Sequence, residues 1–363
     1  MTVTVETLAE MLSAIEYRGD GEVPVENAAS FDKAGPGEVT FVKDAPKLKS
    51  LGTSLASAVI LPKHLVDSLP EQNLPMAIIV VEDALAAFVQ VLEHFSPRRS
   101  LSQVGLSPAA VIDSTVTIGD NANIFPAAQI CADVVIGNNC TILPGVYIGP
   151  GCRLGDDVTL HPNVVLYDSV ILGHRVTIHS SSVIGADGFG YQLVEGRHQR
   201  IPHFGTVRIE DDVEIGACTT IDRALVGETL IGAGTKIDNL VMIGHNCEIG
   251  RHNLFVSQVG LAGSVTTGEY VVCAGQVGIL DHVHLGDAAV FGGRAGVHKD
   301  MPGGQTYLGS PAEPIADEIR MLMVQRKLPE LRRKIIQLEQ QMKTLTDRID
   351  SYPPEGDSSN FAA

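Results

Sequence analysis

The 363-residue chain has no tryptophan, and aromatic residues make up only 5% of it although 44% of its residues are hydrophobic. Its interior must therefore be aliphatic, which suits narrow stacked coils better than a globular core. Basic residues are also few, since 26 lysines and arginines stand against 43 aspartates and glutamates, for a net charge of −17. This charge argues against non-specific binding to nucleic acid or to anionic membranes.

The sequence also lacks segments that would direct it into or across a membrane. No run approaches the roughly 18 apolar residues of a transmembrane segment, and the amino terminus lacks the basic start and apolar stretch of a signal peptide. The six cysteines form no CxxC pair, so we expect free thiols, several of them buried, rather than disulfides or metal ligands. A cytoplasmic location is expected.

A six-residue period dominates the middle of the chain. Every sixth residue from Ile112 to Ile184 is isoleucine or leucine, and the period returns in a new register from Ile231 to Val297, weakened only at Thr267 and Cys273. Neither a helix nor a simple strand repeats every six residues. The period predicts a parallel β-helix over residues 101–310, in which each six-residue unit forms one face of a coil.

Three such faces make a coil of 18 residues, so residues 18 apart should stack about 4.8 Å apart along the axis. Glycine often follows the aliphatic residue, where we expect a tight corner at which a Cβ would clash. The period breaks at residues 187–205 and again around Ala224–Thr229. Such insertions form loops on one side of a solenoid, often the functional side.

Residues 1–100 lack the period and predict a small α/β domain. Val5, Leu8, Leu12 and Ile15 indicate one helix, residues 58–61 and 77–81 indicate strands, and residues 83–95 indicate a second helix with Asp83 as its N-cap. Residues 96–107 form the predicted linker.

The carboxy-terminal segment, residues 311–363, changes period again and predicts a helical, coiled-coil extension. Its apolar residues alternate at spacings of three and four, as in the seam of a coiled coil, at Leu328, Leu331, Ile335, Leu338, Met342, Leu345 and Ile349. Such a seam indicates an oligomer but suits two strands as well as three. A basic cluster lies at its start: Arg326, Lys327, Arg332, Arg333 and Lys334. It is either a solvated helix face or a docking patch for an acidic partner.

A zinc site is one hypothesis for the histidines. His174 and His179 have the H-x4-H spacing of the γ-type carbonic anhydrases, but the third ligand would fall on Asn138. Because only two of three ligands are present, we expect no metal.

His245 is the better candidate for catalysis. It lies two residues after the inward Ile243, so its side chain should project outward. Gly263 should stack directly on it, and Asp281 and His282 one coil further. An imidazole beside a glycine amide offers a general base and an oxyanion donor, as acyl transfer requires. Asp238, one face earlier, is a candidate carboxylate partner for the imidazole.

Several motifs resemble those of the UDP-3-O-(3-hydroxyacyl)glucosamine N-acyltransferases of lipid A biosynthesis, and the resemblance covers nearly the whole chain. They are GADGFGY (185–191), Ile201-Pro202, IGACTTIDRA (215–224), IDNLVMIGHN (237–246) and AGS (262–264). The resemblance implies a left-handed β-helix, a homotrimer with active sites between neighbouring β-helices, and no cofactor. It also implies transfer of a 3-hydroxyacyl chain from the phosphopantetheine of acyl carrier protein to the 2-amino group of a UDP-sugar, UDP-3-O-acyl-glucosamine.

The resemblance assigns roles to particular residues. His245 matches the catalytic histidine, Asp238 its acidic companion, Gly263 the oxyanion amide and His282 a second active-site histidine. Phe189 and Tyr191 of the GADGFGY motif are expected to bind substrate, and Phe41 in the amino-terminal domain is expected to stack on uracil. The resemblance also implies that the basic cluster docks acyl carrier protein.

Three positions depart from the family pattern. Leu48 replaces a second stacking aromatic, Ala224 replaces a glycine and implies a local loop change, and Gly296 replaces a bulkier pocket residue, which implies room for a long chain. Two alternatives to the N-acyltransferase stay open, namely an acetyl-coenzyme A dependent sugar acetyltransferase of the same fold and a non-catalytic trimeric scaffold.

Overall fold

The chain divides into two compact units, residues 1–102 and 103–363. The computed structural model describes residues 2–69, 74–97 and 102–350, with side chains as far as residue 347. Residues 98–101 of the predicted linker lie outside the described residues, as does the side chain of Ile349.

The first unit is an α/β domain around a five-stranded sheet of order β2-β7-β6-β5-β4. Its strands are β2 (Glu16–Arg18), β4 (Asn27–Ala28), β5 (Glu38–Phe41), β6 (Ala58–Pro62) and β7 (Ala77–Val81), and β1 (Val3–Thr4) pairs separately with β3 (Pro24–Val25). The helices are α1 (Val5–Met11), α2 (Ala45–Leu48), η1 (Leu51–Thr53), η2 (Lys63–Ser68) and α3 (Ala84–Phe95).

The central strands β6 and β7 pair in parallel and are buried along their whole length. One face of the sheet packs against α1 and α3 and the other against α2 and η1. Because both faces are covered, these strands are continuous apolar runs in the sequence.

Most predictions for this unit are confirmed, and one helix boundary was wrong. Asp83 caps α3, and its side chain accepts hydrogen bonds from the N–H groups of Leu85 and Ala86. However, α1 ends at Met11, because Ser13 adopts a left-handed φ of 51°. Ile15 therefore lies beyond the helix and is 46% exposed.

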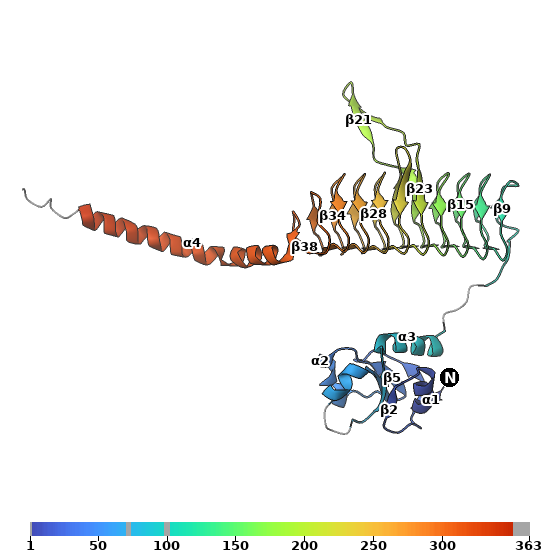
Figure 1. Ribbon diagram of the computed structural model, residues 1–363, viewed down its shortest axis with the longest axis horizontal. Coiled ribbons are helices and arrows are strands. Elements are labelled where there is room, and N and C mark those ends of the chain that lie inside the picture. The colour runs from blue at the N-terminus through green and yellow to red at the C-terminus, as the bar shows by residue number, and fades with distance from the viewer. Residues whose placement is uncertain (1, 70–73, 98–101, 351–363) are drawn as a thin grey trace, which may run out of the picture. The chain divides into compact units, whose positions relative to one another are not determined.

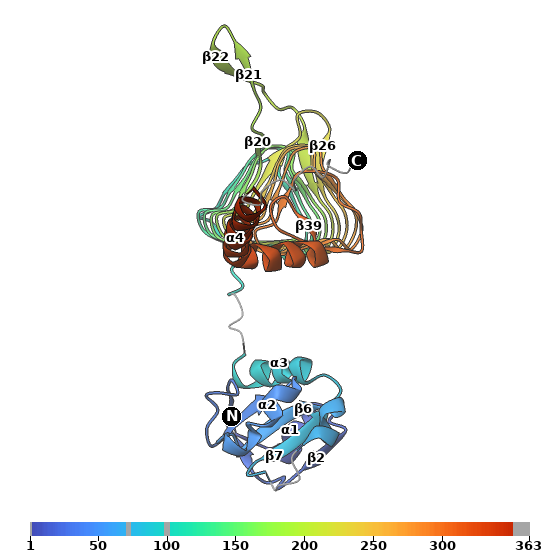
Figure 2. The same ribbon diagram turned by 90° about the vertical axis from the view of Figure 1, so that its left-hand side faces the viewer.

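The second unit is a parallel β-helix (Figure 1), whose coils overlay in a three-sided outline in Figure 2. Its nine-stranded sheet contains β9 (Thr117–Ile118), β12 (Val135–Ile136), β15 (Arg153–Leu154), β18 (Ile171–Leu172), β23 (Thr206–Ile209), β26 (Glu228–Ile231), β29 (Glu248–Ile249), β32 (Thr266–Thr267) and β35 (His284–Leu285). Its ten-stranded sheet contains β8 (Val111–Ile112), β11 (Gln129–Ile130), β14 (Tyr147–Ile148), β17 (Val165–Leu166), β20 (Val183–Asp187), β25 (Thr220–Arg223), β28 (Met242–Ile243), β31 (Gly260–Leu261), β34 (Gly278–Ile279) and β37 (Gly296–Val297). Its eleven-stranded sheet contains β10 (Asn123–Ile124), β13 (Thr141–Ile142), β16 (Thr159–Leu160), β19 (Thr177–Ile178), β24 (Glu214–Ile215), β27 (Lys236–Ile237), β30 (Leu254–Phe255), β33 (Val272–Cys273), β36 (Val290–Phe291), β38 (Thr306–Leu308) and β39 (Glu313–Pro314).

The predicted 18-residue stacking is confirmed. Ile124 pairs with Ile142, and Ile142 pairs with Leu160. All three side chains are fully buried, and the inward residues form one continuous core. The sequence pattern missed three members of this core, Ile209, Ile215 and Ile221, which lie between the two insertions in a register of their own.

The glycine that follows the inward aliphatic residue is required by close approach of neighbouring coils. A Cβ on Gly155 would lie 2.6 Å from the carbonyl oxygen of Gly173, one coil away. The left-handed backbone falls two residues later, as at Asp157 with a φ of 59°. The predicted clash is therefore confirmed, but it involves the adjacent coil rather than the turn itself.

All six cysteines are free, and four of them are buried in the β-helix, as predicted. Burial raises the pKa of Cys152, Cys247 and Cys273 to about 12. These thiols therefore stay protonated and unreactive at neutral pH.

The first insertion carries a hairpin of β21 (Tyr191–Val194) and β22 (Arg197–Arg200). After β39, the helix α4 (Ile315–Asp350) follows, and it is bent (Figure 1). Pro329 lies inside it and removes a backbone donor, which is a common cause of such a bend. Among the described residues, no helix is long and apolar enough to cross a membrane.

Candidate active site

The stacking of His245, Gly263 and His282 is visible in the backbone hydrogen bonds. The N–H of Ser264 donates to the carbonyl of His245 at 2.8 Å, and the N–H of His282 donates to the carbonyl of Gly263 at 3.1 Å. A Cβ on Gly263 would lie 2.6 Å from Nε2 of His245. The half-buried imidazole therefore lies directly against Gly263, at the corner that follows β28.

The Gly263 amide is available as a hydrogen-bond donor. In other coils, the N–H two residues after the inward aliphatic residue is taken by a side chain one coil away, as at Asp120 and Asn138. Within the part of the chain that the structure describes, the Gly263 N–H makes no hydrogen bond. An N–H beside an imidazole has the arrangement that stabilises an oxyanion during acyl transfer.

The first insertion folds back onto His245. His203 is 7% exposed, and its ring meets that of His245 edge to face with a centroid distance of 5.2 Å. Nδ1 of His203 donates to the carbonyl of Ile201 at 3.1 Å, because a carbonyl only accepts. Gly188 fits against both histidines, since a Cβ there would lie 2.7 Å from Cβ of His245 and 2.8 Å from Nε2 of His203.

Asp222 is the half-buried carboxyl group nearest in environment to His245. It follows Ile221, which pairs with Ile243 in the adjacent coil, so Asp222 lies beside the Gly244–His245 corner. Burial raises the pKa of Asp222 to about 6, with His245 opposing the shift and Asp187 adding to it.

Sequence analysis missed both His203 and Asp222. The second insertion lengthens the spacing of Ile221 and Ile243 to 22 residues, so counting back 18 residues from His245 does not reach Asp222. His203 lies in the non-repeating insertion, where coil counting gives no position. Its only sequence signal was its place directly after the Ile201-Pro202 motif.

Asn246 fastens the second insertion to the same corner. Its Oδ1 accepts from the N–H of Leu225 at 2.8 Å, and its Nδ2 donates to the carbonyl of Val226 at 3.1 Å. Ala224 is fully buried, has no left-handed φ, and packs closely on Gly205. The alanine therefore fits this loop without backbone strain.

The structure does not bring Asp238 to His245 within one chain. Asp238 follows β27 in the eleven-stranded sheet, whereas His245 follows β28 in the ten-stranded sheet, so the two residues occupy different corners. Its carboxylate accepts from the N–H groups of Asn239 at 2.7 Å and Ser257 at 3.0 Å. The physical reason is the spacing, because only residues a full coil apart stack.

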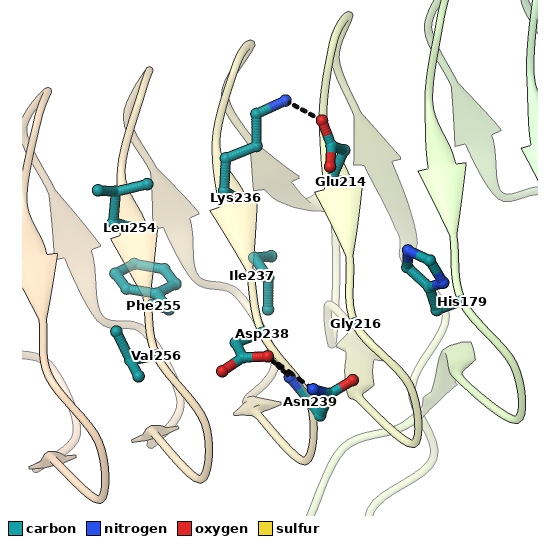
Figure 3. A pocket seen from close by; sticks show the side chains of 10 residues that line it. All are labelled: His179, Glu214, Gly216, Lys236, Ile237, Asp238, Asn239, Leu254, Phe255 and Val256. Carbon is teal, nitrogen blue, oxygen red and sulfur yellow. Dashed lines mark hydrogen bonds and ion pairs between the residues drawn. The ribbon is translucent and has the colours of Figure 1, made fainter. Parts of the chain in front are cut away.

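Asp238 instead lines a groove of about 650 Å³ on the outside of the eleven-stranded sheet (Figure 3). His179 lies at the other end of this groove, and Gly216, which has no side chain, leaves the space between them open. Lys236 and Glu214 form an ion pair at its rim, with Nζ and Oε1 2.7 Å apart.

The remaining predicted site residues are exposed or packed on neighbours. His282 is exposed, and its Nδ1 lies 3.0 Å from a carboxylate oxygen of Asp281. Phe189 is 83% exposed on the first insertion, with its ring 5.0 Å from that of Tyr191. Within the first unit, Phe41 is half-buried and stacks on Phe88 at 4.6 Å.

Leu48 is buried in the core of the first unit, 3% exposed, so the side chain at this position does not present a surface for stacking. In the second unit, all five residues of the basic cluster are exposed on α4, on both sides of Pro329. None of them forms an ion pair with any residue that the structure describes.

The two histidines of the zinc hypothesis lie at different corners and are otherwise engaged. Nδ1 of His174 accepts from the N–H of Asp156 at 2.9 Å, and His179 stacks on His161 at 4.5 Å. Across the described ranges, no group of three or more histidine, cysteine, aspartate or glutamate residues is arranged to hold a metal ion.

Comparison with known proteins gives a consistent result. A family model described as UDP-3-O-(3-hydroxymyristoyl) glucosamine N-acyltransferase matches residues 22–94, and a bacterial transferase hexapeptide model matches residues 115–150 and 151–186. The repeat match agrees with the left-handed parallel β-helix expected from the sequence.

Curated relatives align over nearly the full length. The chain is 48% identical to the UDP-3-O-acylglucosamine N-acyltransferase of Rhodopirellula baltica over 92% of this chain and 86% of that protein. It is 46% identical to the Methylacidiphilum infernorum protein of the same name over 99% of both chains. Among solved structures, an Arabidopsis UDP-N-acetylglucosamine acyltransferase is 24% identical with a TM-score of 0.47, over 58% of this chain and 73% of that chain.

Proposed function

The chain belongs to the UDP-3-O-acylglucosamine N-acyltransferase family of lipid A biosynthesis, and on this basis we propose how its residues carry out the transfer. The donor is a 3-hydroxyacyl chain on the phosphopantetheine thioester of acyl carrier protein. The acceptor is the 2-amino group of UDP-3-O-acyl-glucosamine, and His245 is the general base.

The contact between His245 and Gly263 carries this proposal. As the sugar amine attacks the thioester carbonyl, a C–N bond forms and the carbonyl oxygen becomes negative. The free N–H of Gly263 is the donor for that oxyanion. His245 takes the proton that the amine loses, and the C–S bond then breaks to release the thiol of the carrier, with His245 returning the proton. These steps need no cofactor.

The two partners differ in the surfaces that suit them. Acyl carrier protein is acidic, and the exposed, unpaired basic cluster on α4 complements it. For the nucleotide we assign Phe41, whose ring is backed by Phe88 and half-exposed on the other side. Phe189, Tyr191 and His282, exposed around the catalytic corner, are assigned to substrate contacts.

The active enzyme is a homotrimer in this proposal. Asp238 and His245 occupy different corners of the coil, so a neighbouring β-helix is needed to bring the carboxylate of one chain to the imidazole of the next. The exposed apolar seam of α4 supports the same assembly, since it has nothing to bury it in a single chain. The free thiols suit a reducing compartment, and we place the enzyme in the cytoplasm.

Mass spectrometry of the reaction products tests the proposal. Purified protein is incubated with UDP-3-O-acyl-glucosamine and either 3-hydroxyacyl-carrier protein or acetyl-coenzyme A, with His245→Ala protein as the blank. We expect the mass of one added 3-hydroxyacyl group only with the carrier protein. Acetyl transfer from coenzyme A would support the acetyltransferase alternative, and no transfer from either donor would support the scaffold.

A further inference from the structure

We propose that Asp222 is the positioning residue of His245: its carboxylate, held beside the Gly244–His245 corner of the same chain, orients the imidazole and balances the positive charge that the imidazole acquires when it takes the amine's proton. This inference rests on the proposed function and adds a residue to it.

The backbone register places Asp222 at the required position. Thr220 and Ile221 of β25 pair with Met242 and Ile243 of β28. Because successive side chains alternate along a strand, and Ile221 points into the core, Asp222 points outward on the same side as the catalytic corner. On its other side, β20 pairs with β25 so that Ala186 lies opposite Asp222.

The surrounding segments cover this carboxyl group and hold it in place. Arg223, 7% exposed, donates from Nε to the carbonyl of Gly185 at 2.6 Å and pairs with Asp168 at 2.8 Å. These bonds fix the loop that begins at Gly185. That loop brings Gly188 against His245, and His203 closes the same side from the end of the insertion.

Every charged group that faces Asp222 is accounted for. His245 favours its ionised form, and Asp187 disfavours it. Asp187 is itself paired with Arg200 at 2.6 Å and lies 3.9 Å from Arg223. The neighbouring Cys247 is buried with a pKa raised to about 12, so it carries no charge in the working range.

The pH dependence follows from these neighbours. Burial raises the pKa of Asp222 to about 6, above its ordinary value, so at lower pH the carboxyl is neutral and the imidazolium loses its counter-charge. Activity at low pH then requires two deprotonations, that of His245 as the base and that of Asp222 as its partner. The two groups titrate as a coupled pair.

The test is the pH profile of kcat/KM for UDP-3-O-acyl-glucosamine. We expect the logarithm of kcat/KM in the native enzyme to rise at low pH with a limiting slope of about 2, the value for two required deprotonations. Asp222→Asn should show a slope of about 1, and kcat about ten-fold lower with KM changed less than two-fold, on the scale of one lost charge partner. Asp222→Glu should restore the slope of the native enzyme.

Asp133→Asn is the matched control, because Asp133 is exposed at a left-handed corner that asparagine also adopts, and its profile should be unchanged. Asp187→Asn provides a second measurement that does not alter Asp222, and it should move the second deprotonation to lower pH.

A native slope and native kcat in Asp222→Asn would overturn the inference, and so would an unmoved low-pH limb in Asp187→Asn if Asp222→Asn does not fold. A native enzyme that transfers no acyl chain would instead overturn the proposed function, and the inference with it.

Discussion

Gly263→Ala is a direct test of the contact between the imidazole and the glycine. The new Cβ would lie 2.6 Å from Nε2 and 2.7 Å from Cε1 of His245. Because ordinary van der Waals contact begins at 3.4 Å, the imidazole must move by about 0.8 Å to make room. A displacement of that size costs a catalytic group on the order of 10² in rate, so we expect kcat to fall about 100-fold.

The fold should tolerate this substitution. Gly263 has no left-handed φ, so alanine fits its backbone, and the atoms that it meets belong to a side chain on the outside of the coil. Gly278→Ala is the matched control, because nothing lies within 4 Å of its Cβ position and its φ is also ordinary. Both variants should unfold within a few degrees of the native protein.

The assay is steady-state transfer from 3-hydroxyacyl-carrier protein, followed by mass spectrometry, with thermal unfolding measured in parallel. A Gly263→Ala enzyme with the kcat and KM of the Gly278→Ala control would refute the reasoning. It would show that the imidazole does not need its place against Gly263 during catalysis.

Three further predictions concern the base, the metal and the carrier protein. His245→Ala should keep the fold, because the side chain projects outward, and should lower turnover by about 10² or more; near-native turnover at saturating substrate would contradict the assignment. Elemental analysis should find no stoichiometric zinc and chelators should not inhibit, because His174 and His179 lie at different corners; one zinc per subunit would show this to be wrong. Arg332→Glu with Arg333→Glu should raise KM for acyl carrier protein but not for the sugar nucleotide, and added salt should weaken the native enzyme similarly, since rim charges are screened over about 8 Å. Native carrier kinetics and salt dependence in that variant would leave the cluster a solvated helix face.

The six-residue period was sufficient to predict the β-helix because it is a direct record of packing. Each inward residue is stacked on its equivalent in the next coil, so a gap in the pattern would leave a cavity in a narrow core. The period also located Gly263 and His282 above His245, since no insertion interrupts the coils from Ile231 to Val297.

The same counting failed below His245. An insertion adds residues without adding a coil, so the register shifts and the stacked partner lies at another spacing. Leu172 pairs with Ile209, and Ile209 pairs with Ile231, in place of partners 18 residues away. This shift concealed Ile215 and Ile221 from the core pattern and Asp222 from the site.

The two insertions that interrupt the repeat also complete the site. They meet beside the catalytic corner, where the N–H groups of Phe204 and Gly205 donate to the carbonyls of Leu225 and Ala224, both at 3.0 Å. The regular coils position His245 and Gly263, while the insertions cover one side of the imidazole and shield the neighbouring carboxyl group from water. A strict repeat places an identical environment at every corner, so a corner acquires a distinct chemistry only where the repeat is interrupted.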